Sequence, residues 1–488
     1  MTLKELKCIG RELVLFLAMF AGCFASLVGR RLLKIYVQGQ LSDIKNKNCE
    51  AIALKFDQTP RTLQRFLESI KWNEEQVRDR CQQIIARDHA HQEAIGTVDE
   101  SGIAKSGSCT AGVGRQYNGN RGKVENCIVG VHLGYSTPGF RTILDSRLYL
   151  PEDWTNDPQR RKENYIPDEI EFQTKPQIAL DMIDRASGHG VQVTAWTFDE
   201  LYGRDSKFLD AVNERKQAFV AEIPSDTRVW TTKPKVRHRA RAKAGKKRPT
   251  DVSRVARKPP ACEVRNLITY SSKFQEQSWQ PYRIKDTESG PEVWEVKWLR
   301  VWRKTETKLP SNQQTLIVAR SVRTAEIKYF LSNRVAERHG VTLCWLLRVA
   351  FSRWSIESCF RIAKEELGMD QFQVRGWRCI HRHYYLTALS FLFCSRVRQR
   401  LDGNQARGLT VEQVRHAVNA YLAHHHLPPA LRDEAFKKEL KAPRYHQERN
   451  AQAKKSHTKT RIQFYRDLGI DVDKIKSCIT CSHIDRDP

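Results

Sequence analysis

The chain has 488 residues, of which 83 are Lys or Arg and 56 are Asp or Glu, so its formal net charge at pH 7 is +27. This excess of positive charge predicts a polyanionic partner, with a membrane surface or an acidic protein as alternatives. Eleven Trp and nineteen Phe argue against a disordered basic protein, and the length allows more than one structural unit. The thirteen Cys are scattered, which is typical of reduced thiols in a cytosolic protein rather than a disulfide framework.

Residues 1–92 are predicted to form helices. Within them, residues 13–29 carry no charge and lie between basic residues, a pattern shared by signal peptides and short membrane spans. This stretch of 17 residues is short for a span, and no small-x-small cleavage site follows it. Further along, Ser42 is a candidate N-cap, and Thr59 with Pro60 predicts a helix that has proline in its first turn.

Two apolar runs end in an acidic pair. Residues 94–98 lead into Asp99, and residues 191–198 lead into Asp199. Both patterns are typical of buried strands that deliver a carboxylate at or near the strand end. Removing a carboxylate from water costs free energy unless another group compensates its charge. Divalent metal is a common compensation, and Mg²⁺ usually takes one or two carboxylates together with phosphate oxygens of a substrate.

The rest of the central region alternates between strands and helices. Ser136-Thr-Pro-Gly139 is a hairpin signal between two of the strands. The remaining strands are expected at residues 126–133, 140–150, 219–223, 294–303 and 314–320, and helices at 176–187 and 384–394.

A basic run occupies residues 233–258, where 12 of 26 residues are Lys or Arg and one is Asp. It has too little apolar material to fold alone. The run is therefore either a flexible, solvated linker or an arm that contacts the backbone of the polyanionic partner.

Residues 349–367 have helical periodicity. An apolar stripe is expected along one face, formed by Val349, Ile356, Phe360, Ala363 and Leu367. At about 100° per residue, four charged residues fall within roughly 80° of one another on a neighbouring stripe: Arg353, Glu357, Arg361 and Lys364. Such a face can bring a metal ligand and phosphate-binding groups together. The alternative is a solvated helix with i,i+4 ion pairs.

Four segments, in this order, resemble motifs of the DDE transposases of bacterial insertion sequences. Residues 97–107 resemble the first-Asp motif with its downstream Lys-x-Gly, residues 114–127 the loop into the second strand, and residues 198–203 the second-Asp motif. Arg353-x₃-Glu357-x₆-Lys364 resembles the Arg, Glu and Lys of the Y-R-E-K signature, whose Tyr would fall at Ala350. The resemblance extends from about residue 10 to about residue 395.

The resemblance implies an α/β fold: an RNase H-like mixed sheet flanked by helices, with an N-terminal helical domain and a mostly β insertion before the Glu-bearing helix. For residues 13–29 it implies an amphipathic helix and no membrane anchor. The expected division is a helical DNA-binding domain at 1–92, a catalytic core at 93–223 and 323–415, an insertion at 224–322 and a basic helical tail at 416–488.

The resemblance also implies the chemistry. Asp99, Asp199 and Glu357 would be the catalytic residues and would hold two Mg²⁺ ions, with Mn²⁺ as a substitute. Arg353 and Lys364 would bind DNA phosphates beside the scissile bond. The expected activity is cleavage at insertion-sequence ends and strand transfer into target DNA, by a homodimer on double-stranded DNA in the cytoplasm, at the nucleoid. A nuclease without strand transfer and a catalytically inactive DNA-binding protein are the alternatives.

The C-terminal tail carries Cys478-x-x-Cys481-x-His483, whose spacing resembles half of a zinc site. No second half accompanies it, so a reduced tail without metal is expected.

Overall fold

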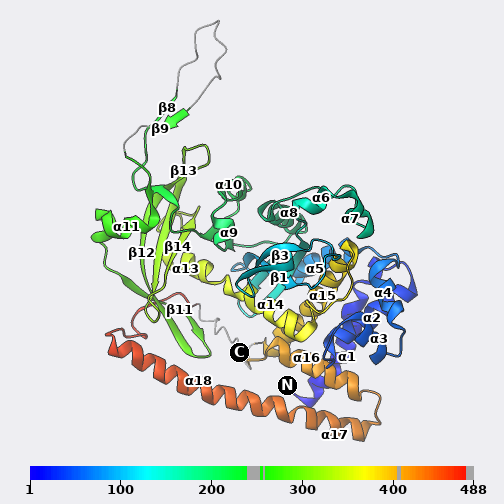
Figure 1. Ribbon diagram of the computed structural model, residues 1–488. Helices are drawn as coiled ribbons and strands as arrows, with labels where there is room; N and C mark the ends of the chain where they lie inside the picture. The colour runs from blue at the N-terminus through cyan, green and yellow to red at the C-terminus, as the bar shows by residue number, and fades with distance from the viewer. Residues whose placement is uncertain (239–252, 256–258, 404–407, 480–488) are drawn as a thin grey trace. The chain divides into compact units, whose positions relative to one another are not determined.

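The computed structural model describes residues 1–238, 253–255, 259–403 and 408–479 (Figure 1). The fold is mixed α/β, with a large mixed sheet flanked by helices, as expected for an RNase H-like protein. The chain divides into two compact units. The first unit contains residues 1–193 and 354–456, and the described part of the second lies within residues 194–353 and 457–479. The five-part division predicted from the sequence stays a prediction.

Five helices form the N-terminal part of the first unit: α1 (Leu3–Ala18), α2 (Leu27–Leu41), α3 (Cys49–Lys55), α4 (Pro60–Glu68) and α5 (Glu74–Asp88). Thr59 and Pro60 begin α4 as predicted. The expected N-cap at Ser42 is wrong, because Ser42 ends α2 and the side chain of Asn48 caps α3 instead. Residues 13–29 are divided between α1 and α2, and no helix in the described residues is long and apolar enough to cross a membrane.

The strands of the first unit are β1 (Ile95–Ala104), β2 (Gly114–Asn118), β3 (Lys123–Thr137) and β4 (Phe140–Leu148). Strand β3 pairs antiparallel with β1, β2 and β4. The predicted hairpin between β3 and β4 is confirmed, and Gly139 supplies its turn with a φ of 80° that other residues rarely adopt.

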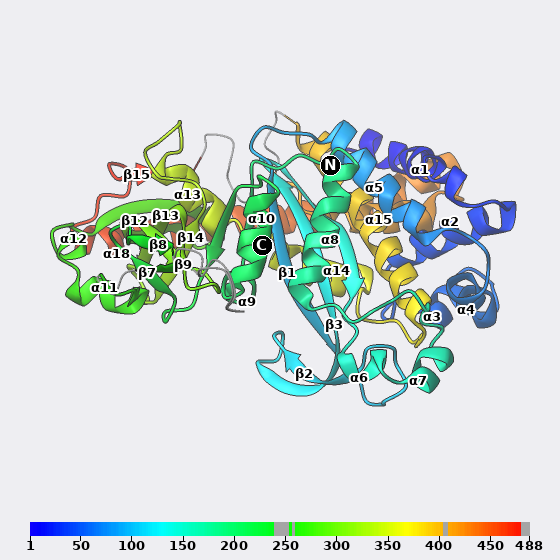
Figure 2. The ribbon, with the colours of Figure 1, turned by 90° about the horizontal axis from the view of Figure 1, so that it is seen from above.

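Three longer helices pack on these strands (Figures 1 and 2). Helix α8 (Lys175–Gly188) contacts β3 and β4, and α14 (Trp354–Leu367) contacts β1, β3 and β4. Helix α15 (Trp377–Asp402) is buried along most of its length between β4 and the helices α2, α4 and α5. Short helices α6 (Glu152–Thr155) and α7 (Pro158–Glu163) precede α8, and α16 (Val411–His424) and α17 (Pro429–Glu439) follow α15.

The second unit has a mixed sheet. Strands β5 (Ala195–Phe198) and β6 (Phe219–Glu222) are parallel, and β6 is antiparallel to β14 (Ile327–Ser332). Strands β13 (Pro310–Ser321), β12 (Gly290–Lys304), β11 (Gln280–Thr287), β7 (Arg228–Trp230) and β10 (Cys262–Glu263) extend it with antiparallel pairings. Strand β15 (Lys476–Ser477) pairs parallel with β11.

The helices of the second unit are α9 (Glu200–Gly203), α10 (Ser206–Glu214), α11 (Val264–Tyr270), α12 (Ser272–Gln275) and α13 (Leu343–Phe351). The long helix α18 (Lys441–Asp467) begins in the first unit and ends in the second. Tyr465 of α18 packs against Val293 of β12, which anchors the end of this helix to the sheet.

Candidate active site

Asp99 lies in the middle of β1 and not near a strand end as predicted, because β1 continues to Ala104, and it pairs in register with His132 of β3. Two residues earlier, Thr97 pairs with Gly134. Because side chains alternate along a strand, Thr97, Asp99 and His132 point to one side, which we call the Asp99 face. Asp99 is 7% exposed, and its Oδ1 accepts a hydrogen bond of 2.8 Å from the backbone N–H of Glu100.

Helix α14 covers the Asp99 face. The side chain of Ile356 lies so close to β3 that a Cβ on Gly134 would be 2.3 Å from Ile356 Cδ1. The ring centroid of His132 is 4.8 Å from that of Phe360 in α14. Glu357, the residue after Ile356, is therefore carried by a helix that packs directly on the strand pair bearing Asp99.

The second acidic residue of the first motif has a different role. Glu100 is the next residue along β1, so it points to the opposite side from Asp99. Its carboxylate forms an ion pair of 2.9 Å with the ammonium group of Lys175, the first residue of α8. The two acidic residues therefore have different roles. Asp99 contributes its carboxylate to the Asp99 face, and Glu100 binds the first residue of α8.

Lys364 is on the same helix as Glu357, two turns later, and is half-buried. Burial, with a smaller contribution from the Lys364 ammonium, lowers the pKa of His132 to about 3. The His132 ring is therefore neutral, and its Nδ1 lies 2.8 Å from Ser146 Oγ. Burial also lowers the pKa of Lys364, and Asp370 opposes that shift. Lys364 is thus a cation of the Asp99 face, and His132 adds no charge there.

The prediction of one helix across residues 349–367 is wrong. Helix α13 ends at Phe351, and α14 begins at Trp354, with Ser352 and Arg353 between them. Ser352 Oγ donates a hydrogen bond of 2.7 Å to the Val349 carbonyl, which satisfies an acceptor at the end of α13.

Arg353 consequently lies outside the helical stripe that was predicted for it. It belongs to the second unit, whereas Glu357 and Lys364 belong to the first. Arg361 forms an i,i+4 ion pair of 3.1 Å with Glu365, and both side chains are exposed. This pair is the solvated arrangement that was the alternative for the segment. Of the predicted stripe, Glu357 and Lys364 remain as candidates on α14.

Asp199 directly follows β5, as predicted, although the strand is shorter than expected and begins at Ala195. Its Oδ1 accepts hydrogen bonds of 3.0 Å from Leu201 N–H and 3.4 Å from Tyr202 N–H, so Asp199 is the N-cap of α9. A Cβ on Gly203 would be 1.8 Å from the Glu222 carbonyl oxygen. The glycine that ends this motif therefore allows α9 to pack on β6.

The donor types of the candidate site suit a hard divalent metal ion. Both Asp99 and Glu357 offer carboxylate oxygens, which Mg²⁺ prefers. The hydroxyl oxygens of Thr97, two residues before Asp99, and of Ser358, next to Glu357, are buried and have no hydrogen-bond partner among the described residues. Within the residues that the structure describes, no group of three or more His, Cys, Asp or Glu side chains is placed to hold a metal ion. Asp199, the third predicted ligand, belongs to the second unit.

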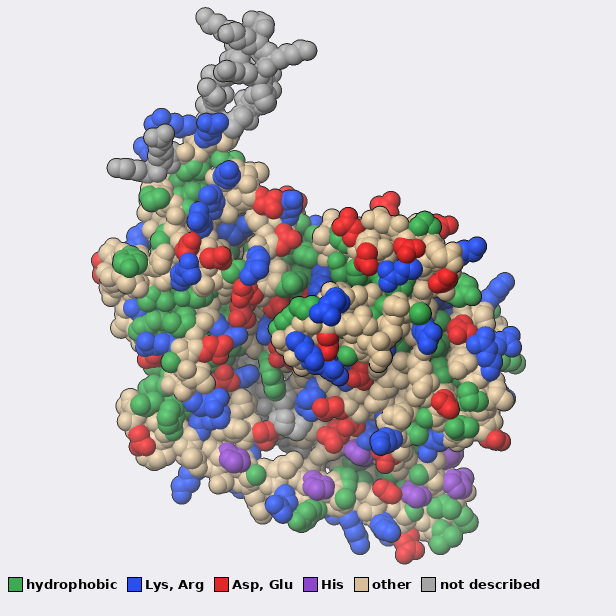
Figure 3. Space-filling view, viewed as in Figure 1, with side chains coloured by type: hydrophobic (Ala, Val, Ile, Leu, Met, Phe, Trp, Pro, Cys, Tyr) green, Lys and Arg blue, Asp and Glu red, His purple; other side chains and the backbone are tan. Residues whose placement is uncertain are grey.

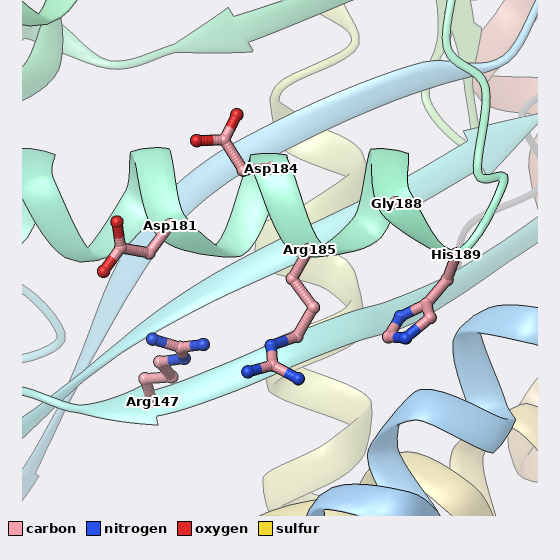
Figure 4. A pocket seen from close by; sticks show the side chains of 6 residues that line it. All are labelled: Arg147, Asp181, Asp184, Arg185, Gly188 and His189. Carbon is pink, nitrogen blue, oxygen red and sulfur yellow. The ribbon is translucent and has the colours of Figure 1, made fainter.

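A cavity of about 500 Å³ lies beside α8 (Figure 4). Arg147 of β4 and Arg185 and His189 of the α8 end line it together with Asp181, Asp184 and Gly188. Arg147 pairs with Val131, which is next to His132 and points away from the Asp99 face. The cavity is lined by both acidic and basic side chains and lies on the opposite side of the strands from Asp99. It is therefore not part of the candidate active site.

The tail motif was expected to be without metal. Cys481 and His483 lie outside the described residues. Cys478 is buried, and its thiol forms a hydrogen bond with Cys344 of α13 that lowers the pKa of Cys344 to about 7.

Gly134→Ala tests the close packing of α14. The added Cβ would overlap with Ile356 Cδ1, so we expect a loss of about 1–3 kcal/mol in unfolding free energy, as for other overpacked cores. Cleavage should fall further, because the displaced helix carries Glu357. Thermal unfolding and single-turnover cleavage would measure both effects.

Two further variants control this test. Adding Ile356→Val removes the Cδ1 methyl and should recover stability. Gly22→Ala should have little effect, because nothing lies within 4 Å of a Cβ there. A Gly134→Ala variant as stable and active as the parent would show that α14 does not need this close approach.

The fold and the Asp99 face agree with a nuclease of the DDE type. A family model described as DDE superfamily endonuclease matches residues 20–291, which is more than half of the chain, so the chain belongs to this family. The resemblance found in the sequence is confirmed. The match contains Asp99 and Asp199 and ends before Glu357. Enzymes of this superfamily act on DNA and generally use divalent metal ions.

One curated relative is a probable transposase for insertion sequence element IS701 from Microchaete diplosiphon. It is 29% identical over 191 residues, which cover 38% of this chain and 47% of the relative. The chain thus spans about half the length of the relative that it matches.

Proposed function

We propose that this protein is an insertion-sequence transposase that cleaves the DNA ends of its element and joins them to target DNA. The observation that carries the proposal is the packing of α14, with Glu357 and Lys364, on the strand pair that bears Asp99. Membership in the DDE endonuclease family and the similarity to an insertion-sequence transposase support it.

In this proposal, Asp99, Asp199 and Glu357 hold two Mg²⁺ ions, for which Mn²⁺ can substitute. Bound ions of this kind lower the pKa of an attacking water or 3′-hydroxyl and stabilise the leaving oxygen. Lys364 binds a phosphate beside the scissile bond, where negative charge develops. Arg353 supplies a second cation from the segment that precedes α14.

The DNA partner is proposed to be the terminal repeats of the element together with target DNA. On the surface in Figure 3, Lys and Arg side chains are interleaved with Asp and Glu, so the excess charge of +27 is not gathered in one stripe there. Affinity should therefore come from many dispersed phosphate contacts and should depend strongly on salt. The N-terminal helices are proposed to read the repeats, and the protein to act as a homodimer at the nucleoid.

A cleavage and joining assay tests the proposal. The protein would be incubated with a plasmid that carries the ends of its own element, with a second plasmid as target, and with Mg²⁺ or EDTA. We expect Mg²⁺-dependent breaks at the element ends and products in which these ends are joined to the target. Breaks without joined products would favour a nuclease, and binding without breaks would favour an inactive DNA-binding protein.

The basic run, Lys233–Lys258, gives a separate prediction. Its short strands β8 (Val236–His238) and β9 (Ser253–Val255) form a two-stranded antiparallel sheet, and residues 239–252 and 256–258 are outside the described part of the chain. Replacing the run with a Gly/Ser linker of equal length should weaken binding to any duplex. It should also flatten the salt dependence, because each lost phosphate contact removes about 0.9 from the slope of log K against log[salt]. An unchanged slope in a fluorescence titration would show that the run is only a linker.

A further inference from the structure

Lys105 occupies a fixed position at the end of β1. It follows Ala104, the last residue of the strand that carries Asp99, and belongs to the Lys-x-Gly of the first motif. Its backbone N–H donates a hydrogen bond of 2.9 Å to the Asn126 carbonyl. Asn126 Nδ2 in turn donates to the Lys105 carbonyl at 2.7 Å and to the Gly107 carbonyl at 3.0 Å. The backbone on both sides of Lys105 is therefore held by one asparagine.

The side chain of Lys105 points to the Asp99 face, because the pairing of β1 with β3 continues through Lys105 and alternate residues share a side. Its Nζ is 3.9 Å from the ring centroid of Phe372, a cation–π distance. Burial lowers the pKa of Lys105 to about 8 and also lowers that of Lys364, and the carboxylate of Asp370 opposes the shift of both. Asp370 and Phe372 belong to the segment that follows α14. One carboxylate thus acts on two ammonium groups, one from β1 and one from α14.

The charges of Lys105, Lys364 and Asp370 do not balance. Two half-buried cations are near one carboxylate. Among the described residues, neither ammonium group has a hydrogen bond or an ion pair within 4.0 Å, and the Lys105 ammonium lies over the face of the Phe372 ring. An ammonium group that is partly removed from water without an acceptor costs free energy. An incoming anion would offset this cost. Phosphate oxygens of DNA have the charge and the acceptors that these residues lack.

We propose that Lys105 and Lys364 together bind neighbouring phosphates of one DNA strand at the Asp99 face, and that Asp370 keeps the two ammonium groups together in the absence of DNA. This assignment rests on the proposed function, since it makes Lys105 a second phosphate-binding residue of the same site. Phe372 and Asn126 are positioning residues, because they hold the side chain and backbone of Lys105.

Salt-dependent binding tests the lysine pair. The probe is a short fluorescent DNA duplex, titrated with the full-length protein in EDTA over a range of NaCl concentrations. Lys105→Met and Lys364→Met should each make the negative slope of log K against log[NaCl] shallower by about 0.9, and the double variant by about twice as much. Lys105→Arg should keep the parent slope. The matched control is Lys437→Met, which removes an exposed lysine of α17 in the same unit and should leave the slope unchanged.

Asp370→Asn separates DNA binding from a structural role. If the lysines bind phosphates, removal of the carboxylate raises the local net positive charge and should tighten binding several-fold at low salt. If Lys105 only anchors the loop through Asp370, then Asp370→Asn and Lys105→Met should both lower the melting temperature and leave the salt slope as in the parent, which would overturn the proposal.

Because EDTA removes divalent metal, this result does not depend on cleavage. Failure of the proposed function would instead appear as a parent protein that binds DNA but makes no Mg²⁺-dependent breaks.

Discussion

Asp99→Asn is expected to abolish strand cleavage, while the variant still folds and binds DNA. The amide has the same shape as the carboxylate but no negative charge, and Asp99 is nearly buried on the face covered by α14. Loss of a metal ligand should remove several kcal/mol of transition-state stabilisation. At about 1.4 kcal/mol for each tenfold change, this corresponds to a rate loss on the order of 10³-fold or more. Single-turnover cleavage at saturating DNA with Mg²⁺ measures it.

Matched substitutions make this result specific. Glu100→Gln, one residue along β1, should lose the ion pair with Lys175 and some stability but keep cleavage. Asp199→Asn should behave like Asp99→Asn, and asparagine would still cap α9, so a lost N-cap cannot explain its inactivity. Glu357→Gln should also be inactive, whereas Glu365→Gln should remain active. A Glu357→Gln variant that cleaves at the parent rate beside an inactive Glu365→Gln variant would show that the glutamate has been assigned wrongly.

Arg382→Lys is expected to destabilise the first unit by about 3–5 kcal/mol, the usual cost of breaking a buried charge network. Arg382 is 2% exposed near the beginning of α15, and its guanidinium lies 4.3 Å from the Trp72 ring. Its nitrogens donate hydrogen bonds of 2.9–3.2 Å to the carbonyls of Phe66, Leu67, Ile70 and Trp72 and to the carboxylate of Glu74. A lysine ammonium keeps the charge but cannot reach acceptors on both sides of the planar group.

The neighbouring arginine provides the control for Arg382→Lys. Arg378 is one helical turn earlier, forms an ion pair of 3.2 Å with the same Glu74, and has a side chain that is 53% exposed. Arg378→Lys should therefore change stability little, as is usual for exposed ion pairs. Urea unfolding monitored by tryptophan fluorescence compares the two variants. Equal midpoints would mean that the carbonyl contacts of Arg382 contribute little.

Local patterns in the sequence were sufficient for the turn at Gly139, the acidic residue after β5 and the strand residues that lead into Asp99, but not for the continuation of β1 to Ala104. These features depend on neighbouring residues, and alternation of apolar side chains marks them directly. The break between α13 and α14 was missed because the apolar periodicity continues through it. At the break, the hydroxyl and the backbone N–H of Ser352 both donate to the Val349 carbonyl, the acceptor that the next helical turn would use.

Other parts of the site depend on contacts between distant segments. Gly134 and Ile356 touch only after β3 and α14 have packed, and no local pattern marks this contact. Lys105 is part of the first motif in the sequence. Its proximity to Phe372 and Asp370 forms only when the segment after α14 has folded against the end of β1. The placement of Arg353 outside the helix followed from the same missed break.

The division of the first unit into two stretches of chain has a consequence for synthesis on the ribosome. Residues 1–193 emerge first, and α14 and α15 follow only after the whole of residues 194–353 has been translated. Until then, the strand pair that bears Asp99 lacks α14, which covers the Asp99 face, and the long-range contacts that complete it form late. A product that terminates before residue 354 contains Asp99 and Asp199 but neither Glu357 nor Lys364. If the proposed function holds, such a product should not cut DNA, because it lacks the proposed catalytic glutamate.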